Sequence, residues 1–595
     1  MPASRDRRHS TSASITFRRN RRLSPNTLTK GWFRDNKHRW VLGFKAALSV
    51  DPSPFMPTES SWYVVIEDVP PRPKITIFPA ADGGITCTFP HQAANLCGPT
   101  DSLWRMGYPC IERPEAAFKR DAVTGEPAEL GERIIWRLGR LLSWIDAAAC
   151  GRLVEIGDPV ELPTFDAASG TTLGFNETLS DLPGWSSQVG NWGYAVTGAI
   201  SCAYKYRQVI RYLTTDGHVF KQDALRQEGA DLPVDAVWVM LPRMPIVAPW
   251  QAPMVWHELS MCLESDSISL EDIFRQAGFR SRTLKRSSPS RLLLGFPFAQ
   301  KVGQKPERIH WIAVENIGLS DATAKRNGFR PVENNRAIWD AARAASRDGI
   351  RWMKTANWAS DQLRTRGEAE DAVRSRRVLV IGAGAIGSAV AENLARMGVH
   401  DFGIIDGDLL DIGNLSRHTL GMPDCGHAKA EAVAARLKNC APDIAAVAYK
   451  GTFPPTDARI AEELRRYDVL IDCTGSDAVL RSMAEFDWRT EKLFVSLSIG
   501  WGAQEFFCFS LSEAGFPALD ALDRFGRNLT FKPQMEEANR EGIGCWHPVF
   551  PASADDIQLW GAIGSKYVRN AILSKERQCK IYRLMDDATV TVIDG

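Results

Sequence analysis

A glycine-rich segment is the feature that most constrains how this chain folds. The stretch "VLVIGAGAIGSAV", residues 378–390, is a run of apolar strand residues, then glycines spaced G-x-G-x-x-G at Gly382, Gly384 and Gly387, then a helical pattern. Such glycines allow a tight turn, a close approach of the backbone to phosphate, and close packing of the helix on the strand. The segment therefore predicts a strand–turn–helix unit whose helix N-terminus binds a phosphate-bearing nucleotide.

The glycines alone do not identify the nucleotide. Asp406 follows Gly387 by about 20 residues, the spacing at which an acidic side chain bonds a ribose hydroxyl. Both NAD and ATP satisfy this pattern. NAD would indicate an oxidoreductase that transfers hydride, and ATP would indicate an adenylating enzyme.

Length, charge and cysteine usage exclude several classes of protein. The 595 residues are too many for one core, so we expect three domains. The net charge of +1 gives no reason to expect nucleic-acid or membrane binding. The sequence lacks the run of about 20 apolar residues of a membrane helix and the apolar core of a signal peptide, which favours a cytoplasmic protein. The twelve cysteines form no C-x-x-C pair, so we expect neither a disulfide framework nor zinc.

The chain divides into four predicted parts. Residues 1–30 form a basic, disordered tail, and residues 31–165 an α+β domain. In that domain we expect a helix at "KHRWVLGFKAAL" (37–48), strands at "WYVVIEDV", "KITIFPA" and "GGITCTF", and a long helix over 131–151. Residues 166–365 are α/β with no assigned role, with strands such as "AVWVMLP", "RLLLGFPF" and "RIHWIAV" and a helix at "NRAIWDAARAASR". Residues 366–595, with "RVLVIG", "DFGIID", "YDVLIDCT" and "KLFVSLS", form a Rossmann-like, doubly wound parallel sheet, so the fold class is multidomain α/β.

The segment after the second strand of this sheet separates ATP from NAD. It carries Asp406, Asp408, Asn414, Arg417 and Lys429 in a polar, Gly-containing loop. Lys429 begins a helical pattern, where a triphosphate would meet both its ammonium group and the helix N-terminus. Arg417 offers a planar fork to the same phosphates. The alternative is a solvated loop with surface ion pairs.

The motif "DGDLLDIGNLSRH" followed by "GHAK" resembles the D-x-D…N-L-x-R-Q…G-x-x-K signature of the ThiF/MoeB and ubiquitin-activating enzyme superfamily. The resemblance covers about residues 374–573 and implies ATP-dependent adenylation of the C-terminal carboxylate of a ubiquitin-like protein. It implies that Asp406 and Asp408 contact the ribose and metal–nucleotide region, while Asn414, Arg417 and Lys429 surround the phosphates. Fixed cations and Mg²⁺ would stabilise the charge that develops on the α-phosphate and on pyrophosphate.

One position departs from the family pattern. After "VLIDCT" the family places an Asp-Asn pair whose Asp serves Mg²⁺, whereas this chain has Gly475-Ser476. We expect Asp472 or Asp477 to take over the metal. The zinc-binding cysteine pairs of many bacterial members are also missing.

Two cysteines are candidates for thioester chemistry. In ubiquitin-activating relatives a cysteine after the adenylation core attacks the acyl-adenylate. "REGIGCWHPVF" places Cys545 in a Gly-rich turn near His547, where a thiol is activated by an adjacent imidazole. The alternative is a packed structural cysteine.

The second cysteine lies in residues 31–165, which resemble bacterial ubiquitin-conjugating-type domains in carrying Pro-His, then W-x-x-G-x-x-C, then a helix. In that pattern Cys110 is the acceptor cysteine, in preference to Cys97. His91 and Asn95 lie where conjugating enzymes keep a His-Pro-Asn element, but here the order is Pro90-His91-Gln92.

The combination resembles bacterial fusions of a ubiquitin-conjugating-type and a ubiquitin-activating-type domain, found in antiphage CBASS operons and related ubiquitin-like conjugation operons. It implies that ATP adenylates a protein C-terminus, that Cys545 and then Cys110 carry the acyl group, and that an amine on a protein or small molecule accepts it. The implied partner is a cGAS/DncV-like nucleotidyltransferase or a ubiquitin-like protein, and the implied oligomer is a homodimer. The alternatives are an NAD-dependent oxidoreductase, a sulfur-carrier adenylyltransferase and an inactive nucleotide-binding scaffold.

Overall fold

The structure is a computed structural model, and it describes residues 31–111, 125–165, 170–200, 205–222, 232–283, 288–320, 332–528, 540–541, 547–548 and 552–594. The predicted basic tail, residues 1–30, lies outside these ranges. The described residues form two compact units, one up to Asn357 and one from Trp358 onward. Among the described helices, none is long and apolar enough to span a membrane.

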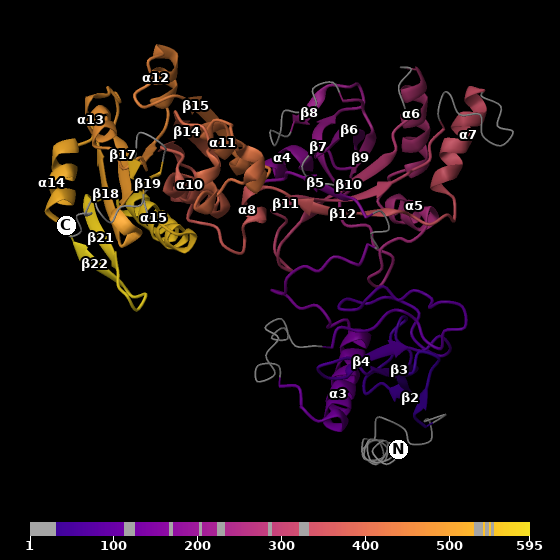
Figure 1. Ribbon diagram of the computed structural model, residues 1–595. Helices are drawn as coiled ribbons and strands as arrows, with labels where there is room; N and C mark the ends of the chain where they lie inside the picture. Colours follow the sequence, from indigo (N-terminus) through magenta and orange to yellow (C-terminus); the bar gives the residue numbers. More distant parts are fainter. Residues whose placement is uncertain are drawn as a thin grey trace. The chain divides into compact units, whose positions relative to one another are not determined.

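The first unit begins with a four-stranded antiparallel sheet covered by one long helix (Figure 1). The sheet order is β1-β2-β3-β4, and the helix is α3 (Leu130–Ala149). Helix α3 buries Leu138, Leu141 and Ile145 against the sheet residues Trp62 and Val64. The α+β character and the long helix are as expected. The strands are β1 (Phe33–Arg34), β2 (Trp40–Ala47), β3 (Glu59–Glu67) and β4 (Lys74–Pro79).

Two local predictions in this part are wrong. Residues 37–48, expected to be helical, contain strand β2, because Leu42, Phe44 and Ala46 enter the core at every second position while Val41 is buried on the other face. Residues 83–89, expected to be a strand, form a loop. The side-chain amide of Asn95 donates to carbonyl oxygens of this loop, which a neighbouring strand would otherwise satisfy.

The rest of the first unit is an eight-stranded sheet that closes on itself. Its order is β5-β12-β11-β10-β9-β6-β7-β8, and β5 also pairs with β7, so seven of the strands form a ring. Helices α5 (Trp256–Glu264) and α6 (Leu270–Thr283) connect the parallel neighbours β9 and β10. The predicted strands at 236–242, 291–298 and 308–314 and the helix at 335–347 are confirmed. The remaining bounds are β5 (Thr172–Phe175), β6 (Trp192–Ala199), β7 (Tyr206–Leu213), β8 (Val219–Gln222), β9 (Ala236–Met240), β10 (Arg291–Phe298), β11 (Arg308–Glu315), β12 (Trp352–Asn357), α4 (Leu182–Ser186) and α7 (Glu333–Ala344).

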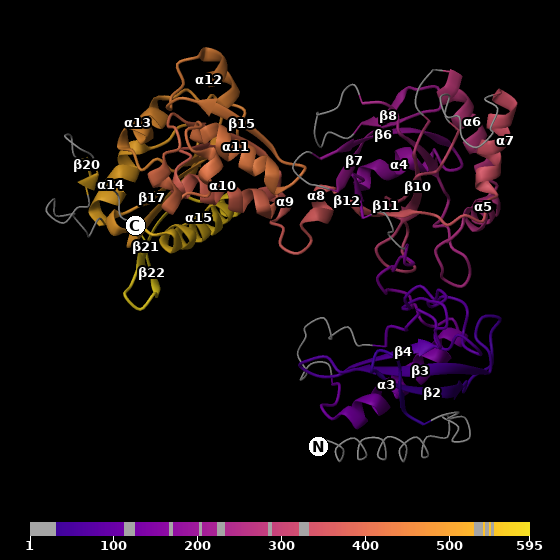
Figure 2. The ribbon, with the colours of Figure 1, turned by 45° about the vertical axis from the view of Figure 1, so that its right-hand side comes forward.

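The second unit is a doubly wound sheet of order β15-β14-β13-β16-β17-β18-β21-β22 (Figure 2). The first five strands are parallel, as predicted, and the last three extend the sheet with antiparallel pairing, which was not predicted. The parallel part alternates with helices in the order β13 (Arg377–Ile381), α10 (Ala385–Met397), β14 (Asp401–Asp406), α11 (Lys429–Cys440), β15 (Ala445–Lys450), α12 (Ala458–Leu464), β16 (Val469–Asp472), α13 (Asp477–Glu485) and β17 (Lys492–Ile499). The remaining elements are α8 (Ser360–Leu363), α9 (Asp371–Arg374), β18 (Glu505–Glu513), α14 (Ala518–Asn528), β19 (Arg540–Glu541), β20 (His547–Pro548), α15 (Ala554–Ser574), β21 (Gln578–Leu584) and β22 (Val590–Asp594).

The strand order of the second unit locates a binding crevice. From β13 the chain winds one way to β14 and β15, then the other way to β16 and β17. In such sheets ligands bind at this reversal, beyond the carboxyl ends of the strands. Helices α10 and α15 lie side by side (Figure 1, Figure 2). The side-chain amide of Asn393 on α10 donates to the hydroxyl of Ser565 on α15 at 3.1 Å. Helix α15 therefore flanks this crevice.

A buried carboxylate inside the closed sheet gives the first testable prediction. Glu177 is completely buried and accepts hydrogen bonds from the indole nitrogens of Trp185 and Trp311 and from Lys221, each at 2.9 Å. Burial raises the pKa of Glu177 to about 7, although Lys221 opposes the shift.

Between the ordinary pKa of 4.5 and about 7, the folded protein therefore holds a proton that the unfolded chain releases, so stability falls as pH rises through this window. Glu177→Gln removes the titrating carboxyl group and with it this pH-dependent contribution to the free energy of unfolding. Between about pH 5 and about pH 8, wild type should lose about 2–3 kcal/mol of unfolding free energy relative to the variant, measured by chemical denaturation of the full chain. Parallel pH profiles for the two proteins would contradict this assignment.

Candidate active site

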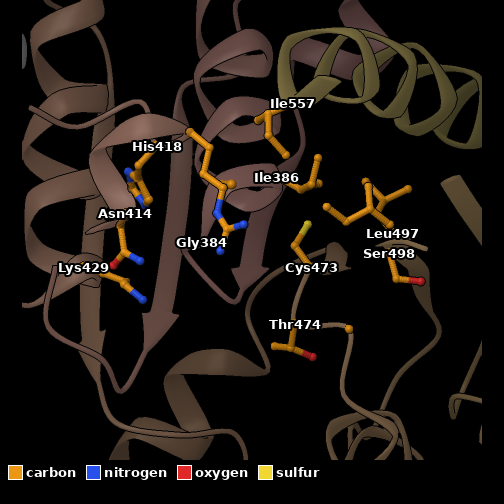
Figure 3. Close-up of a pocket in the computed structure, with 14 residues that line it drawn as sticks. Gly384, Ile386, Asn414, His418, Lys429, Cys473, Thr474, Leu497, Ser498 and Ile557 are labelled. Carbon is orange, nitrogen blue, oxygen red and sulfur yellow. The ribbon is translucent and has the colours of Figure 1, made fainter. Parts of the chain in front are cut away.

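A cavity of about 300 Å³ opens at the carboxyl ends of the parallel strands of the second unit (Figure 3). Five segments of the chain line it. The lining residues are 384–386 after β13; Asn414, Arg417, His418 and Lys429 after β14; 473–475 after β16; 497–499 at the end of β17; and Ile557 of α15. The cavity thus lies at the reversal of strand order.

The three glycines have separable roles at this cavity. Gly382 has φ of +90°, and a Cβ there would lie 2.8 Å from Thr474 Cγ2. A Cβ on Gly387 would lie 1.9 Å from the carbonyl oxygen of Gly382, so only glycine permits this contact between helix and loop. Gly384 precedes the first residue of α10, lines the cavity and has nothing within 4 Å of its Cβ position. The amide groups at the start of α10 therefore border open space that suits an anion.

Asp406 stabilises the loop that carries the glycines. One of its carboxylate oxygens accepts the backbone N–H of Ala383 at 2.7 Å, and the other accepts that of Asp408 at 2.8 Å. Asp406 is not among the residues that line the cavity. Its expected contact with ribose therefore stays a prediction.

Three polar residues predicted from the sequence share one wall of the cavity. Asn414, Arg417 and Lys429 line it, and Figure 3 shows Asn414 and Lys429 on the same side, with His418 beyond them. The ammonium of Lys429, 12% exposed, lies 3.0 Å from the carboxylate of Asp408, which is 74% exposed. Because two cationic side chains and the N-terminus of α10 border one cavity, the site is suited to phosphate groups.

His418 is a site residue that the sequence analysis missed. Its Nε2 lies 2.8 Å from the carbonyl oxygen of Ala383 and therefore donates, while Nδ1 accepts the backbone N–H of Leu420 at 3.1 Å. This pairing requires a neutral imidazole, and burial lowers the pKa of His418 accordingly. His418 thus ties the loop after β14 to the glycine loop. Its position directly after Arg417, where the resembled signature has Gln, was the available signal.

The loop after β16, where the metal ligands were expected, lines another side of the cavity with Cys473, Thr474 and Gly475. Asp472 is 1% exposed, and its carboxylate accepts the backbone N–H and the hydroxyl of Thr474, at 3.1 and 2.6 Å, and the hydroxyl of Ser496 at 3.0 Å. Burial raises the pKa of Asp472. Asp477 is exposed in the first turn of α13, and Gly475 lines the cavity with φ of +63°.

The described residues hold no cluster of three or more His, Cys, Asp or Glu side chains that could bind a metal ion. Mg²⁺ commonly takes one or two protein carboxylates and completes its shell with phosphate and water. The residues present therefore fit Mg²⁺ only as an ion that enters with a nucleotide.

Cys110 lies in the first unit, in an exposed position. Its backbone N–H donates to the carbonyl oxygen of His91 at 2.6 Å, and Gln92 and Pro109 form a β-bridge beside this bond. Asn95 is 1% exposed, and its side-chain amide donates to Ile85 and Cys87.

Asn95 therefore acts within the fold rather than toward Cys110. Cys97, the competing cysteine, is also exposed and contacts Arg105. Cys545 lies outside the described residues, so its role stays a prediction from the sequence.

The chain is 45% identical over 564 residues to the ATP-dependent ubiquitin transferase-like protein Cap2 of Enterobacter hormaechei subsp. hoffmannii, covering 94% of both chains. This chain belongs to the Cap2 family. Residues 151–358 match the profile of the Cap2 central linker domain, and residues 359–504 match the ThiF family, so the cavity loops after β13, β14 and β16 all fall in the ThiF match.

More distant relatives match a smaller share of this chain. An adenylyltransferase and sulfurtransferase of Aspergillus terreus is 36% identical over 18% of this chain and 22% of its own length. The molybdopterin-synthase adenylyltransferase of Escherichia coli is 31% identical over 19% of this chain and 45% of its own length. A crystal structure of E. coli MccB is 15% identical, covering 38% of this chain and 64% of that chain, with a TM-score of 0.28. The ThiF match and these adenylyltransferases support ATP as the nucleotide that the family uses.

The different surroundings of two glycines give a matched pair of variants. Gly387→Ala should lower the unfolding free energy by about 1–3 kcal/mol, because its methyl group collides with the Gly382 carbonyl. Gly384→Ala should leave stability unchanged and weaken ATP binding, because its methyl group enters the cavity at the start of α10. Denaturation curves and calorimetric ATP titration measure both effects. Equal stability of the two variants would contradict this division of roles.

Proposed function

We propose that this chain uses ATP to adenylate the C-terminal carboxylate of a protein and then transfers the acyl group through thioesters to an amine. The observation that carries the proposal is the cavity where Gly384, Arg417 and Lys429 meet, in a chain of the Cap2 family. The carboxylate oxygen bonds to the α-phosphorus of ATP, and the bond from that phosphorus to pyrophosphate breaks. The carboxylate is already ionised at neutral pH, so no general base is needed.

The chain's own groups stabilise the charge that this step creates. Arg417 and Lys429 hold the phosphates and offset the negative charge that grows on pyrophosphate, and the N-terminus of α10 faces the same charge. Asp406 and His418 keep the glycine loop fixed through Ala383. Because these groups are held in place before the reaction, little reorganisation is required of them.

Mg²⁺ supplies charge neutralisation to the bound phosphates, and we assign its protein ligand to Asp477 rather than Asp472. The carboxylate of Asp472 is engaged by Thr474 and Ser496, whereas that of Asp477 is exposed two residues beyond Gly475, which lines the cavity. No zinc is expected in this scheme.

The metal assignment is tested by Asp477→Asn with Asp472→Asn as its matched control. Asp477→Asn should raise the Mg²⁺ concentration for half-maximal ATP–pyrophosphate exchange about tenfold. Asp472→Asn should leave this Mg²⁺ dependence unchanged, because its buried side chain is engaged by Thr474 and Ser496. The reverse order of effects would overturn the assignment.

The acyl group then passes through two thiols in this proposal. Cys545 attacks the acyl-adenylate and releases AMP, and Cys110 attacks the resulting thioester and releases the Cys545 thiol. The exposed position of Cys110 and the Gly-rich sequence around Cys545 support access for both steps. Residues 31–165 then act as a conjugating-type domain, residues 166–365 as a linker domain and residues 366–595 as the adenylation domain with its cysteine segment.

The proposed partner is the C-terminus of a cGAS/DncV-like nucleotidyltransferase, in cytoplasmic antiphage defence. A ubiquitin-like protein is the second candidate for the same chemistry. We also propose a homodimer through the second unit. Three large apolar side chains of the segment between β14 and α11 support it: Leu409, Ile412 and Met422 are each more than 60% exposed. Exposed apolar side chains gathered in one region mark interaction surfaces.

The order of transfer is tested by trapping thiol-sensitive adducts. The full chain is mixed with ATP, Mg²⁺ and the proposed partner, a cGAS/DncV-like nucleotidyltransferase. Cys545→Ala should give no adduct, because the first acceptor is missing, and Cys110→Ala should give an adduct stalled on Cys545. Non-reducing gels and mass spectrometry of the modified peptide locate the bond.

Cys97→Ala is the matched control, because it removes another exposed thiol from the same domain. It should behave like wild type. Adducts of equal amount in all four proteins would refute the two-thiol route. Transfer of sulfur instead of an acyl group would favour the activity of the adenylyltransferases that match 18–19% of this chain.

A further inference from the structure

A histidine and a glutamate side chain lie within hydrogen-bond distance of each other, next to Cys110. His91 Nδ1 lies 2.8 Å from Glu161 Oε2, and the backbone N–H of His91 lies 3.3 Å from the same oxygen. The side chains are 42% and 45% exposed, so the pair is held in place while still open to solvent. One carboxylate oxygen therefore orients both the ring and the backbone of His91.

His91 is joined directly to the backbone of Cys110. The carbonyl oxygen of His91 accepts the N–H of Cys110 at 2.6 Å, and the adjacent Gln92 pairs with Pro109. His91 also has φ of +55°, a conformation that non-glycine residues rarely adopt and that concentrates at functional sites. The surrounding contacts thus hold His91 in an unfavourable backbone state beside the acceptor cysteine.

Glu161 lies within residues 151–358, which match the Cap2 central linker domain and overlap the end of the proposed conjugating-type domain. Its segment pairs with the loop between β10 and β11: Val160 N–H donates to Gln300 at 2.9 Å, and Val302 N–H donates to Asp158 at 2.8 Å. A further contact joins Trp250 N–H to the carbonyl of Thr88 at 3.1 Å, three residues before His91. The eight-stranded sheet of the first unit therefore anchors the segment that carries Glu161, whose carboxylate orients His91.

The contact with Glu161 determines which ring nitrogen of His91 can accept a proton. When Nδ1–H donates to a carboxylate, Nε2 carries the lone pair and accepts protons. A base oriented by a carboxylate in this way is suited to take a proton from a nucleophile. Attack of an amine on a thioester needs such a proton acceptor, whereas attack of a thiolate does not.

We infer that His91 accepts the proton of the amine that attacks the Cys110 thioester, and that Glu161 is the positioning residue for His91. The inference rests on the proposed function of Cys110. The amine nitrogen bonds to the thioester carbon and the carbon–sulfur bond breaks. The nitrogen loses one proton to Nε2 of His91, and the departing Cys110 thiolate takes that proton back, so the products are an amide and a thiol.

The test compares two nucleophiles on one thioester. The full chain is loaded with the nucleotidyltransferase, ATP is exhausted, and loss of the Cys110 adduct is followed after adding either free lysine or 2-mercaptoethanol. His91→Asn suits the positive φ and should slow discharge to lysine about 100-fold, and Glu161→Gln should slow it about tenfold. Discharge to the thiol should be unchanged in both variants. Glu155→Gln removes an exposed carboxylate from the same segment and should match wild type for both nucleophiles.

The outcomes separate the inference from the function on which it rests. Equal slowing with lysine and with thiol would show that the pair has a merely structural role and would overturn the inference. So would wild-type discharge to lysine in the loaded variants. If wild type never forms a thioester on Cys110, the proposed function fails and the inference falls with it.

Discussion

The contact between the Gly387 backbone and the carbonyl oxygen of Gly382 determines the geometry of the second unit. A Cβ at Gly387 would lie 1.9 Å from that oxygen, so the start of α10 can approach β13 this closely only without a side chain. The contact aims the first amide groups of α10 into the crevice where the strand order reverses. Asp406 and His418 then hold the intervening Ala383 from both sides, at 2.7 and 2.8 Å.

The cavity gains its chemical character from the two loops that face this helix end. The loop after β14 brings Arg417 and Lys429, and the loop after β16 brings Thr474 and Gly475. A positive wall opposite a wall of small residues can hold phosphates and leave room for a second substrate. The glycine motif is shared with redox enzymes, and the 45% identity to Cap2 assigns this chain to the Cap2 family.

Features that depend on residues close in sequence were predictable. The glycine loop, the parallel strands and the grouping of Asn414, Arg417 and Lys429 all follow from local patterns, because parallel strands bring their carboxyl ends to one edge. Residues 37–48 were misassigned because their apolar positions fit a helix as well as a strand, and only the partner strands decide. Ile557 and Glu161 were not predicted as site residues, because only the tertiary fold brings them close to the cavity and to His91, which are distant from them in sequence. The hydrogen bond from Ser496 to Asp472 was not predicted for the same reason, whereas the one from Thr474 is local in sequence.

The central claim is that this cavity cleaves ATP at its α-phosphate. The most direct measurement supplies the full chain with Mg²⁺, the proposed partner, a cGAS/DncV-like nucleotidyltransferase, and ATP labelled on the α-phosphate, and separates the labelled products. The account predicts that labelled AMP and unlabelled pyrophosphate form, and that they form only when the partner carries its C-terminal residues. Labelled ADP with free phosphate, or reduction of NAD by the same protein, would contradict it.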